Sequence, residues 1–431
     1  MSEKNKFYKC LDSLILGGTM EQKRTIPQNV LQGIMSMFMC NNFYEEFACY
    51  YVNYDVLKEC SFFIYSDDEG QELPPIFKTN FENDFAVIEI GFSDRYYAID
   101  SNICEDMFRN GVANYKLDVC IELDTQAVSY LKKMFKSRNE VDIPLDKQEL
   151  FYYLNEPGIN YSSLPYMVEN AKKITKSNFE QIYLNLKSYE MFKNFDFKLY
   201  VDADIISYKK DEAYMQVMTD QMFSGMQSET FKNSMRDFYD IQKMIYCLLM
   251  KAVLIEWNNS KKSTINKMKI LIDYINNSLG VFCEREMAIC YFYFQHNEGT
   301  KKFFKKVNKG SKEIENTING MAWDLTHIRL IEKLYSFTIG SDIKFGIHPI
   351  LTYDNGLKDI LKLYPIKKMA IYDGFTIPCF KLKFVDLVPD SKVLLFDEVV
   401  TEKRKKVFER ANINGLMNEL NEEMNLINVA Q

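Results

Sequence analysis

Two aspartates stand where a carboxylate would be available for chemistry. Asp124 directly follows the apolar stretch Leu117–Leu123, and Asp354 directly follows the apolar stretch 349–353. Short apolar stretches of this kind predict buried strands, and the carboxyl ends of strands form the ligand-binding edge of an open α/β sheet. If the two strands are neighbours, we expect Asp124 and Asp354 to converge at that edge.

Two further acids border apolar helix faces. Asp324 has Ile328 and Ile331 four and seven residues later, so its carboxylate lies beside an apolar stripe of a predicted helix. That placement costs free energy unless the carboxylate is paired or binds a metal ion. Glu169 lies early in another predicted helix, which begins near Pro165 and has apolar neighbours.

Carboxylates that gather in one place repel one another at neutral pH, and a hard divalent cation relieves that repulsion. Mg²⁺ and Mn²⁺ prefer oxygen ligands, and a pair of such ions can activate water against a phosphodiester. The pattern therefore predicts a site for Mg²⁺ or Mn²⁺. We expect Asp124, Asp324 and Asp354 to be its metal ligands, with Glu169 as a fourth catalytic acid.

Residues 123–131 resemble the opening strand and turn of PIN-domain nucleases. The helix that carries Asp324, followed by the stretch 350–357, resembles the closing half of that family, in which a strand ends in Thr-x-Asp. The resemblance covers about a third of the chain and places the family's middle acid on Glu169. It implies a parallel α/β sandwich, divalent metal ions and phosphodiester cleavage, of RNA rather than DNA, and family habit suggests a toxin or antiviral defence effector.

The predicted fold class is α/β, a PIN-like parallel-sheet sandwich with a large mainly α-helical insertion and a mixed N-terminal segment. Helical periodicity with little Gly or Pro marks the insertion, while short β-rich segments, including 381–385 and 392–396, mark the rest. The predicted parts are a mixed α/β segment at 1–115, the first part of the core at 116–174, the helical insertion at 175–320, the second part of the core at 321–400 and a charged helical tail at 401–431.

Each candidate residue also has a simpler interpretation. Asp124 and Asp354 could be turn residues, Asp324 could cap a helix or pair with a cation, and Glu169 could be a surface acid. Arg329 could contact the scissile phosphate or form an ion pair on its own helix.

Basic and imidazole side chains are equally open to two interpretations. Lys305 and Lys306 belong to a lysine run that could follow a nucleic-acid backbone or form a solvated face. His327 is typical of a structural histidine as well as a catalytic one.

Composition limits the classes of function. The net charge of −7 counts against a sequence-independent duplex binder, and only three histidines count against a His/Cys zinc site. Ten cysteines without a Cys-x-x-Cys pair indicate reduced thiols. Together with the lack of a signal peptide or of a long apolar run, they predict a cytoplasmic protein with no membrane segment. The alternative function is a non-catalytic protein that binds a protein partner through its helical block.

Overall fold

The structure is a computed structural model that describes residues 26–73, 86–113, 117–145, 159–336 and 345–429, with the single positions 148, 151 and 154. It is a mixed α/β fold that contains parallel and antiparallel strand pairs. The chain forms two compact units. Unit 1 comprises Met1–Met235, Leu330–Asp354 and Ile366–Cys379, and unit 2 comprises Arg236–Arg329, Asn355–Pro365 and Phe380–Gln431.

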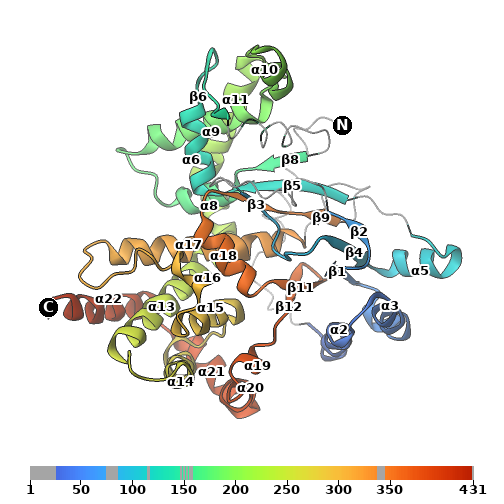
Figure 1. The fold of residues 1–431 in the computed structure, drawn as a ribbon, viewed down its shortest axis with the longest axis vertical. Coiled ribbons are helices and arrows are strands. Elements are labelled where there is room, and N and C mark those ends of the chain that lie inside the picture. Colours follow the sequence, from blue (N-terminus) through green and yellow to red (C-terminus); the bar gives the residue numbers. More distant parts are fainter. Residues whose placement is uncertain are drawn as a thin grey trace. The chain divides into compact units, whose positions relative to one another are not determined.

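One sheet of unit 1 contains the parallel strands that the sequence predicts. Strand β5 lies at its centre, between β10 and β8, and β9 pairs with the first half of β5. Figure 1 labels β3, β5, β8 and β9 of this sheet. Strand β3 pairs antiparallel with β10. The strands are β3 (Ala86–Ile88), β5 (Leu117–Leu123), β8 (Ile159–Ser162), β9 (Phe345–Ile347) and β10 (Ile350–Thr352).

Strand β5 is buried at every position after the first, as expected for a central parallel strand that is covered on both faces. The helices α6 (Thr125–Met134) and α8 (Leu164–Ala171) contact it, and α9 (Phe179–Asn194) packs on α6. The predicted order of a strand at β5, a helix at α6 and a second helix at α8 is therefore confirmed.

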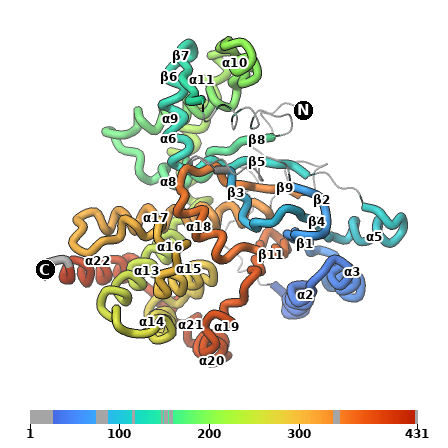
Figure 2. The backbone as a smooth tube through the Cα atoms, in the orientation of Figure 1, coloured from blue at the N-terminus to red at the C-terminus, as the bar shows by residue number. Residues whose placement is uncertain are grey.

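The second large sheet of unit 1 joins the N-terminal part of the chain to a late hairpin. Its order is β12-β11-β1-β4-β2, and β1 pairs antiparallel with β11 although about 300 residues separate them (Figure 2). Because these strands share one sheet, the described part of segment 1–115 is not a separate domain. The strands are β1 (Cys60–Ser66), β2 (Gln71–Glu72), β4 (Arg95–Ile99), β11 (Ile366–Tyr372) and β12 (Phe375–Phe380).

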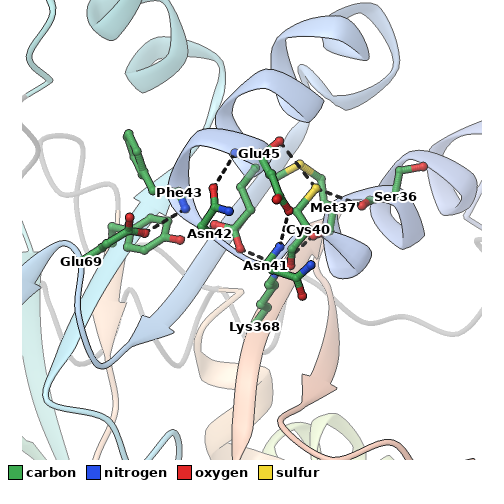
Figure 3. A network of polar contacts seen from close by, with 11 residues as sticks. Ser36, Met37, Cys40, Asn41, Asn42, Phe43, Glu45, Glu69 and Lys368 are labelled. Carbon is green, nitrogen blue, oxygen red and sulfur yellow. Dashed lines mark hydrogen bonds and ion pairs between the residues drawn. The ribbon is translucent and has the colours of Figure 1, made fainter.

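A buried lysine ties the first helices to this sheet (Figure 3). Lys368, on β11, is fully buried, and its Nζ donates to the carbonyl oxygens of Met37 (2.8 Å) and Cys40 (2.6 Å) where α2 (Gln28–Met39) ends. The same Nζ lies 2.6 Å from Oε1 of the buried Glu46, on α3 (Phe43–Val52). A cation at a helix C-terminus is favourable, and the carboxylate balances its buried charge.

The remaining elements of unit 1 are helices and a separate two-stranded hairpin. They are α4 (Tyr54–Leu57), α5 (Ser101–Asn110), β6 (Phe135–Ser137), β7 (Glu140–Val141), α10 (Phe197–Ala203), α11 (Glu212–Gln227) and α12 (Glu229–Ser234). Helices α9 to α12 belong to unit 1, so the predicted insertion 175–320 is helical but does not form one domain.

Unit 2 is mainly helical and is built around the apolar helix α13 (Arg236–Asn258), which packs on α14, α15 and α22. Helix α17 (Ile314–Leu334) runs from unit 2 into unit 1. The other elements are α14 (Thr264–Tyr274), the π-helix η2 (Ile275–Leu279), α15 (Glu284–Phe294), α16 (Glu298–Lys301), α18 (Asn355–Leu363), α19 (Phe384–Leu387), α20 (Ser391–Phe396), α21 (Glu398–Arg410) and α22 (Ile413–Val429).

The predicted strands at 381–385 and 392–396 are wrong. Strand β12 ends at Phe380, and the helices α19 and α20 occupy the two segments. Both segments are short apolar runs, for which periodicity does not distinguish a strand from a helical turn. The predicted helical tail from 401 is confirmed by α21 and α22.

Within the described residues, none of the helices combines the length and the apolar character needed to cross a membrane.

Candidate functional site

Three parallel strands of unit 1 end at the same edge of their sheet. Glu122 of β5 pairs with Ser162 of β8 on one side and with Ile350 of β10 on the other. Beyond the last pair, the backbone N–H of Asp124 donates to the carbonyl oxygen of Leu351 at 3.2 Å. The expectation that Asp124 and Asp354 follow neighbouring parallel strands is therefore confirmed.

Asp124 has a structural role as well as a candidate functional one. It is 2% exposed, and its Oδ1 accepts a hydrogen bond from the Ala127 N–H at 2.6 Å, which makes it the N-cap of α6. The Thr352 hydroxyl, at the end of β10, also hydrogen-bonds its carboxylate. The cap satisfies a backbone donor that the first turn of a helix leaves without a partner, and it fixes the carboxylate at the strand end.

The surroundings of Asp124 disfavour its negative charge. Burial raises the pKa of Asp124 from 3.8 to about 7, and the hydrogen bonds from Thr352 and Ala127 reduce that rise. The carboxylates of Glu169 and Asp354 raise the same pKa further by repulsion. Glu169 and Asp354 are therefore each close enough to interact with Asp124, and a bound cation would relieve their repulsion of its carboxylate.

Glu169 reaches this edge from α8, the helix that follows β8. Its Oε2 accepts a hydrogen bond from the Thr125 hydroxyl at the start of α6, and its Oε1 pairs with Lys173 Nζ at 2.6 Å. The side chain of Glu169 is 12% exposed, whereas that of Lys173 is 42% exposed. The ion pair lies at the surface and is therefore one that a stronger cation can replace.

Asp354 lies two residues beyond β10 and is half-buried. Its backbone N–H donates to the Thr352 hydroxyl at 3.0 Å, so Thr352 contacts both Asp124 and Asp354. The ring of Tyr353 stacks on Tyr130 of α6 at a centroid distance of 4.1 Å and holds this segment against the helix. The hydroxyls of Thr125 and Thr352 also contact these acids, and the sequence argument assigned neither hydroxyl a role, although Thr352 is part of the Thr-x-Asp strand end.

The donor set at this edge consists of oxygen atoms alone, which suits Mg²⁺ or Mn²⁺. The three carboxylates do not form a compact set of ligands. Among the described residues, one group of three or more His, Cys, Asp and Glu offers ligand atoms that all lie within 4.8 Å of one another, and it consists of Cys120, Glu122 and His348. For the three carboxylates to share one ion at the strand ends, the side chain of Glu169 or Asp354 must therefore turn.

The other predicted residues belong to unit 2. Asp324 and Arg329 are on the part of α17 that belongs to this unit, whereas Asp124, Glu169 and Asp354 belong to unit 1, and Asp324 remains a predicted metal ligand. The guanidinium of Arg329 donates two hydrogen bonds to the fully buried carboxylate of Glu286 on α15, one of them 2.9 Å long. This pairing gives Arg329 a structural role, and its predicted phosphate contact remains a prediction.

Lys305 and Lys306 are exposed in unit 2, on a turn whose neighbours Phe303, Phe304 and Val307 are buried. They remain predicted contacts for a nucleic-acid backbone. His327 is 1% exposed on α17 and lies beside Trp323, with a ring distance of 6.0 Å, which is typical of a structural histidine.

Comparisons of this chain with protein families, with characterised proteins and with solved structures find no match.

Proposed function

We propose that unit 1 binds Mg²⁺ or Mn²⁺ through Asp124, Glu169 and Asp354 and hydrolyses phosphodiester bonds, with RNA as the favoured substrate. The observation that carries the proposal is the convergence of these carboxylates at the ends of β8, β5 and β10. Ligand sites of open α/β sheets lie outside the carboxyl ends of the strands. The resemblance of 123–131 and 350–357 to PIN-domain nucleases supports the same chemistry and a PIN-like sheet.

The three acids would hold the cation in different ways. Asp124 is fixed by the α6 cap and by Thr352, so it is the preorganised ligand. Asp354 is half-buried and anchored through its own N–H, so its carboxylate can turn toward solvent and substrate. Glu169 would exchange its ion pair with Lys173 for the metal ion.

A bound divalent cation would supply an activated water molecule and would offset negative charge on the phosphate. Asp124, Glu169 and Asp354 would position that cation at the strand ends. Without a metal ion, Lys173 balances the charge of Glu169, and the hydrogen bond from Thr125 to Glu169 links α6 to α8. Asp324 and the exposed Lys305 and Lys306 lie in unit 2, and their predicted contributions to metal and RNA binding are not needed for this proposal.

The test is an RNA cleavage assay on the purified full chain, with Asp354→Asn as the diagnostic variant. We expect cleavage that requires Mg²⁺ or Mn²⁺, that stops with EDTA, and that falls on the order of a hundredfold or more in Asp354→Asn, as when a key electrostatic group is removed. An Asn residue would serve a turn nearly as well as Asp, so a purely structural Asp354 predicts near-normal activity.

The matched control is Asp106→Asn, because Asp106 is also a half-buried aspartate of unit 1 but lies on α5. It should leave cleavage unchanged. A folded Asp354→Asn protein with full activity, or a wild-type protein that cleaves equally well in EDTA, would refute the proposal. A wild-type protein that cleaves no RNA with either metal would favour the non-catalytic interaction protein instead.

A further inference from the structure

A second cluster of potential metal ligands lies along β5, away from the strand ends. Side chains alternate along a strand, so Asp118, Cys120 and Glu122 share one face of β5. All three are buried, with exposures of 6%, 8% and 1%. Burying charged groups on a strand face costs free energy unless hydrogen bonds, an opposite charge or a metal ion compensate them. We therefore expect such a partner on this face.

The register of the neighbouring strands places a histidine on the same face. Val119 pairs with Ile347 of β9, and Glu122 pairs with Ile350 of β10, so the connecting residue His348 lies opposite Cys120 without a shift in register. Paired residues of parallel strands point to the same face. One ligand atom each from Cys120, Glu122 and His348 accordingly lie within 4.8 Å of one another.

The polar atoms of the pair formed by Glu122 and His348 are only partly satisfied. His348 is 1% exposed, and its Nδ1 lies 3.1 Å from Glu122 Oε1. Among the described residues, neither His348 Nε2 nor Glu122 Oε2 has a hydrogen-bond partner, although both atoms are buried. A buried polar atom without a partner is costly, so two of them in one contact point to a ligand.

The residues around the His348 imidazole leave space for the ring and cover it from solvent. A Cβ at Gly346, the residue two positions earlier on the same face, would lie 3.0 Å from His348 Nε2, so a side chain there would crowd the ring. Tyr335 covers the imidazole from another side with a ring distance of 5.7 Å. The site is therefore enclosed within unit 1.

We propose that Cys120, Glu122 and His348 bind a single divalent cation of the zinc class. Sulfur, nitrogen and oxygen ligands together select Zn²⁺ over Mg²⁺, and a buried site with three protein ligands leaves one tetrahedral position for water. In such a tetrahedron, bonds of about 2.0–2.3 Å set ligand atoms somewhat under 4 Å apart, so ligand atoms that lie within 4.8 Å of one another need only small side-chain shifts. This inference does not depend on the proposed nuclease activity.

The direct test uses the full wild-type chain, stripped with EDTA and titrated with Co²⁺ as the probe. We expect one equivalent of Co²⁺ to give the visible absorption of a tetrahedral ion together with a near-ultraviolet thiolate band. Cys120→Ser should remove the thiolate band, and His348→Gln should weaken Co²⁺ binding at least about tenfold, since even outer-shell changes at metal sites cost that much. Cys104→Ser is the control, because Cys104 is a buried thiol of unit 1 on α5.

X-ray absorption on the wild-type protein loaded with one equivalent of Zn²⁺ tests the site without any variant. We expect one sulfur at about 2.3 Å and nitrogen or oxygen ligands at about 2.0–2.1 Å. No tetrahedral Co²⁺ spectrum, a zinc shell without sulfur or with several sulfurs, or a thiolate band that Cys104→Ser removes and Cys120→Ser retains would overturn the proposal.

Discussion

Strand β5 carries one polar cluster at its carboxyl end and another along its length. At the end, Asp124 interacts with Glu169 and Asp354, and only Asp124 of these three is fully buried. Along the strand, Cys120 and Glu122 meet His348, and all three are buried. The first cluster offers oxygen atoms alone, whereas the second offers sulfur, oxygen and nitrogen.

The difference follows from where each cluster lies on the strand. The carboxyl end of a strand lies beside loops and helix N-termini, so carboxylates there can exchange partners and reach a substrate. A position within a central parallel strand is covered on both faces, so polar groups there must be satisfied internally. We therefore assign reaction chemistry to the strand ends and a bound structural cation to the interior.

The largest effect that separates the two clusters is expected from Asp124→Asn. It removes the preorganised carboxylate at the strand ends and should lower Mn²⁺-dependent RNA cleavage by about a hundredfold or more. It should leave the Co²⁺ thiolate band of the Cys120 cluster at full amplitude, because Asp124 contributes no ligand there. Parallel measurements of cleavage rate and absorption check this. Loss of both signals together would mean that the two clusters form one site.

A smaller expected effect of Asp124→Asn is on folding stability and on how that stability depends on pH. Burial raises the pKa of Asp124 from 3.8 to about 7, so the folded state binds more protons than the unfolded state between these values, and stability falls as pH rises through this window. Each pKa unit corresponds to about 1.4 kcal/mol. Asp124→Asn keeps a good N-cap but makes weaker hydrogen bonds, so we expect it to stabilise the protein in EDTA by about 1–3 kcal/mol at pH 8.

Urea denaturation at pH 8 and at pH 4 measures this effect. At pH 4 the Asp124 carboxyl of the folded wild-type protein is largely protonated, so the stabilisation by Asp124→Asn should nearly vanish. Glu89, whose pKa burial also raises to about 7, remains unchanged in both proteins and cancels in the comparison. An Asp124→Asn protein that is less stable than wild type at pH 8 would show that the cap and the Thr352 contact outweigh the charge.

The strand-end acids could be predicted from the sequence because the signal is local. An apolar run followed by Asp predicted both β5 with Asp124 and β10 with Asp354, and the structure has both strands and pairs them. The roles of Thr125 and Thr352 could not be predicted in the same way. Their contacts arise from the packing of α6, α8 and β10, and that packing depends on residues far apart in the sequence.

The Cys120 cluster shows why counts of residue types did not point to this candidate site. Three histidines in 431 residues argued against zinc, yet one histidine is enough when strand register places it opposite a cysteine and beside a glutamate. The alternation of Asp118, Cys120 and Glu122 in an otherwise apolar strand was the available signal. The sequence predicts a phosphate contact or an ion pair on its own helix for Arg329, but it does not predict the contact with Glu286, which lies on another helix, 43 residues earlier.

Mn²⁺ binding measured by electron paramagnetic resonance tests the central claim, a hard-cation site at the strand ends, most directly. One equivalent of Zn²⁺ is added first to occupy the Cys120 cluster, and the loss of the free Mn²⁺ signal then reports binding. We predict that wild type and Asp106→Asn bind Mn²⁺ equally, and that Asp354→Asn and Asp124→Asn each bind it at least about tenfold more weakly. Wild-type protein that leaves the Mn²⁺ signal unchanged, or both variants binding as wild type does, would contradict the account.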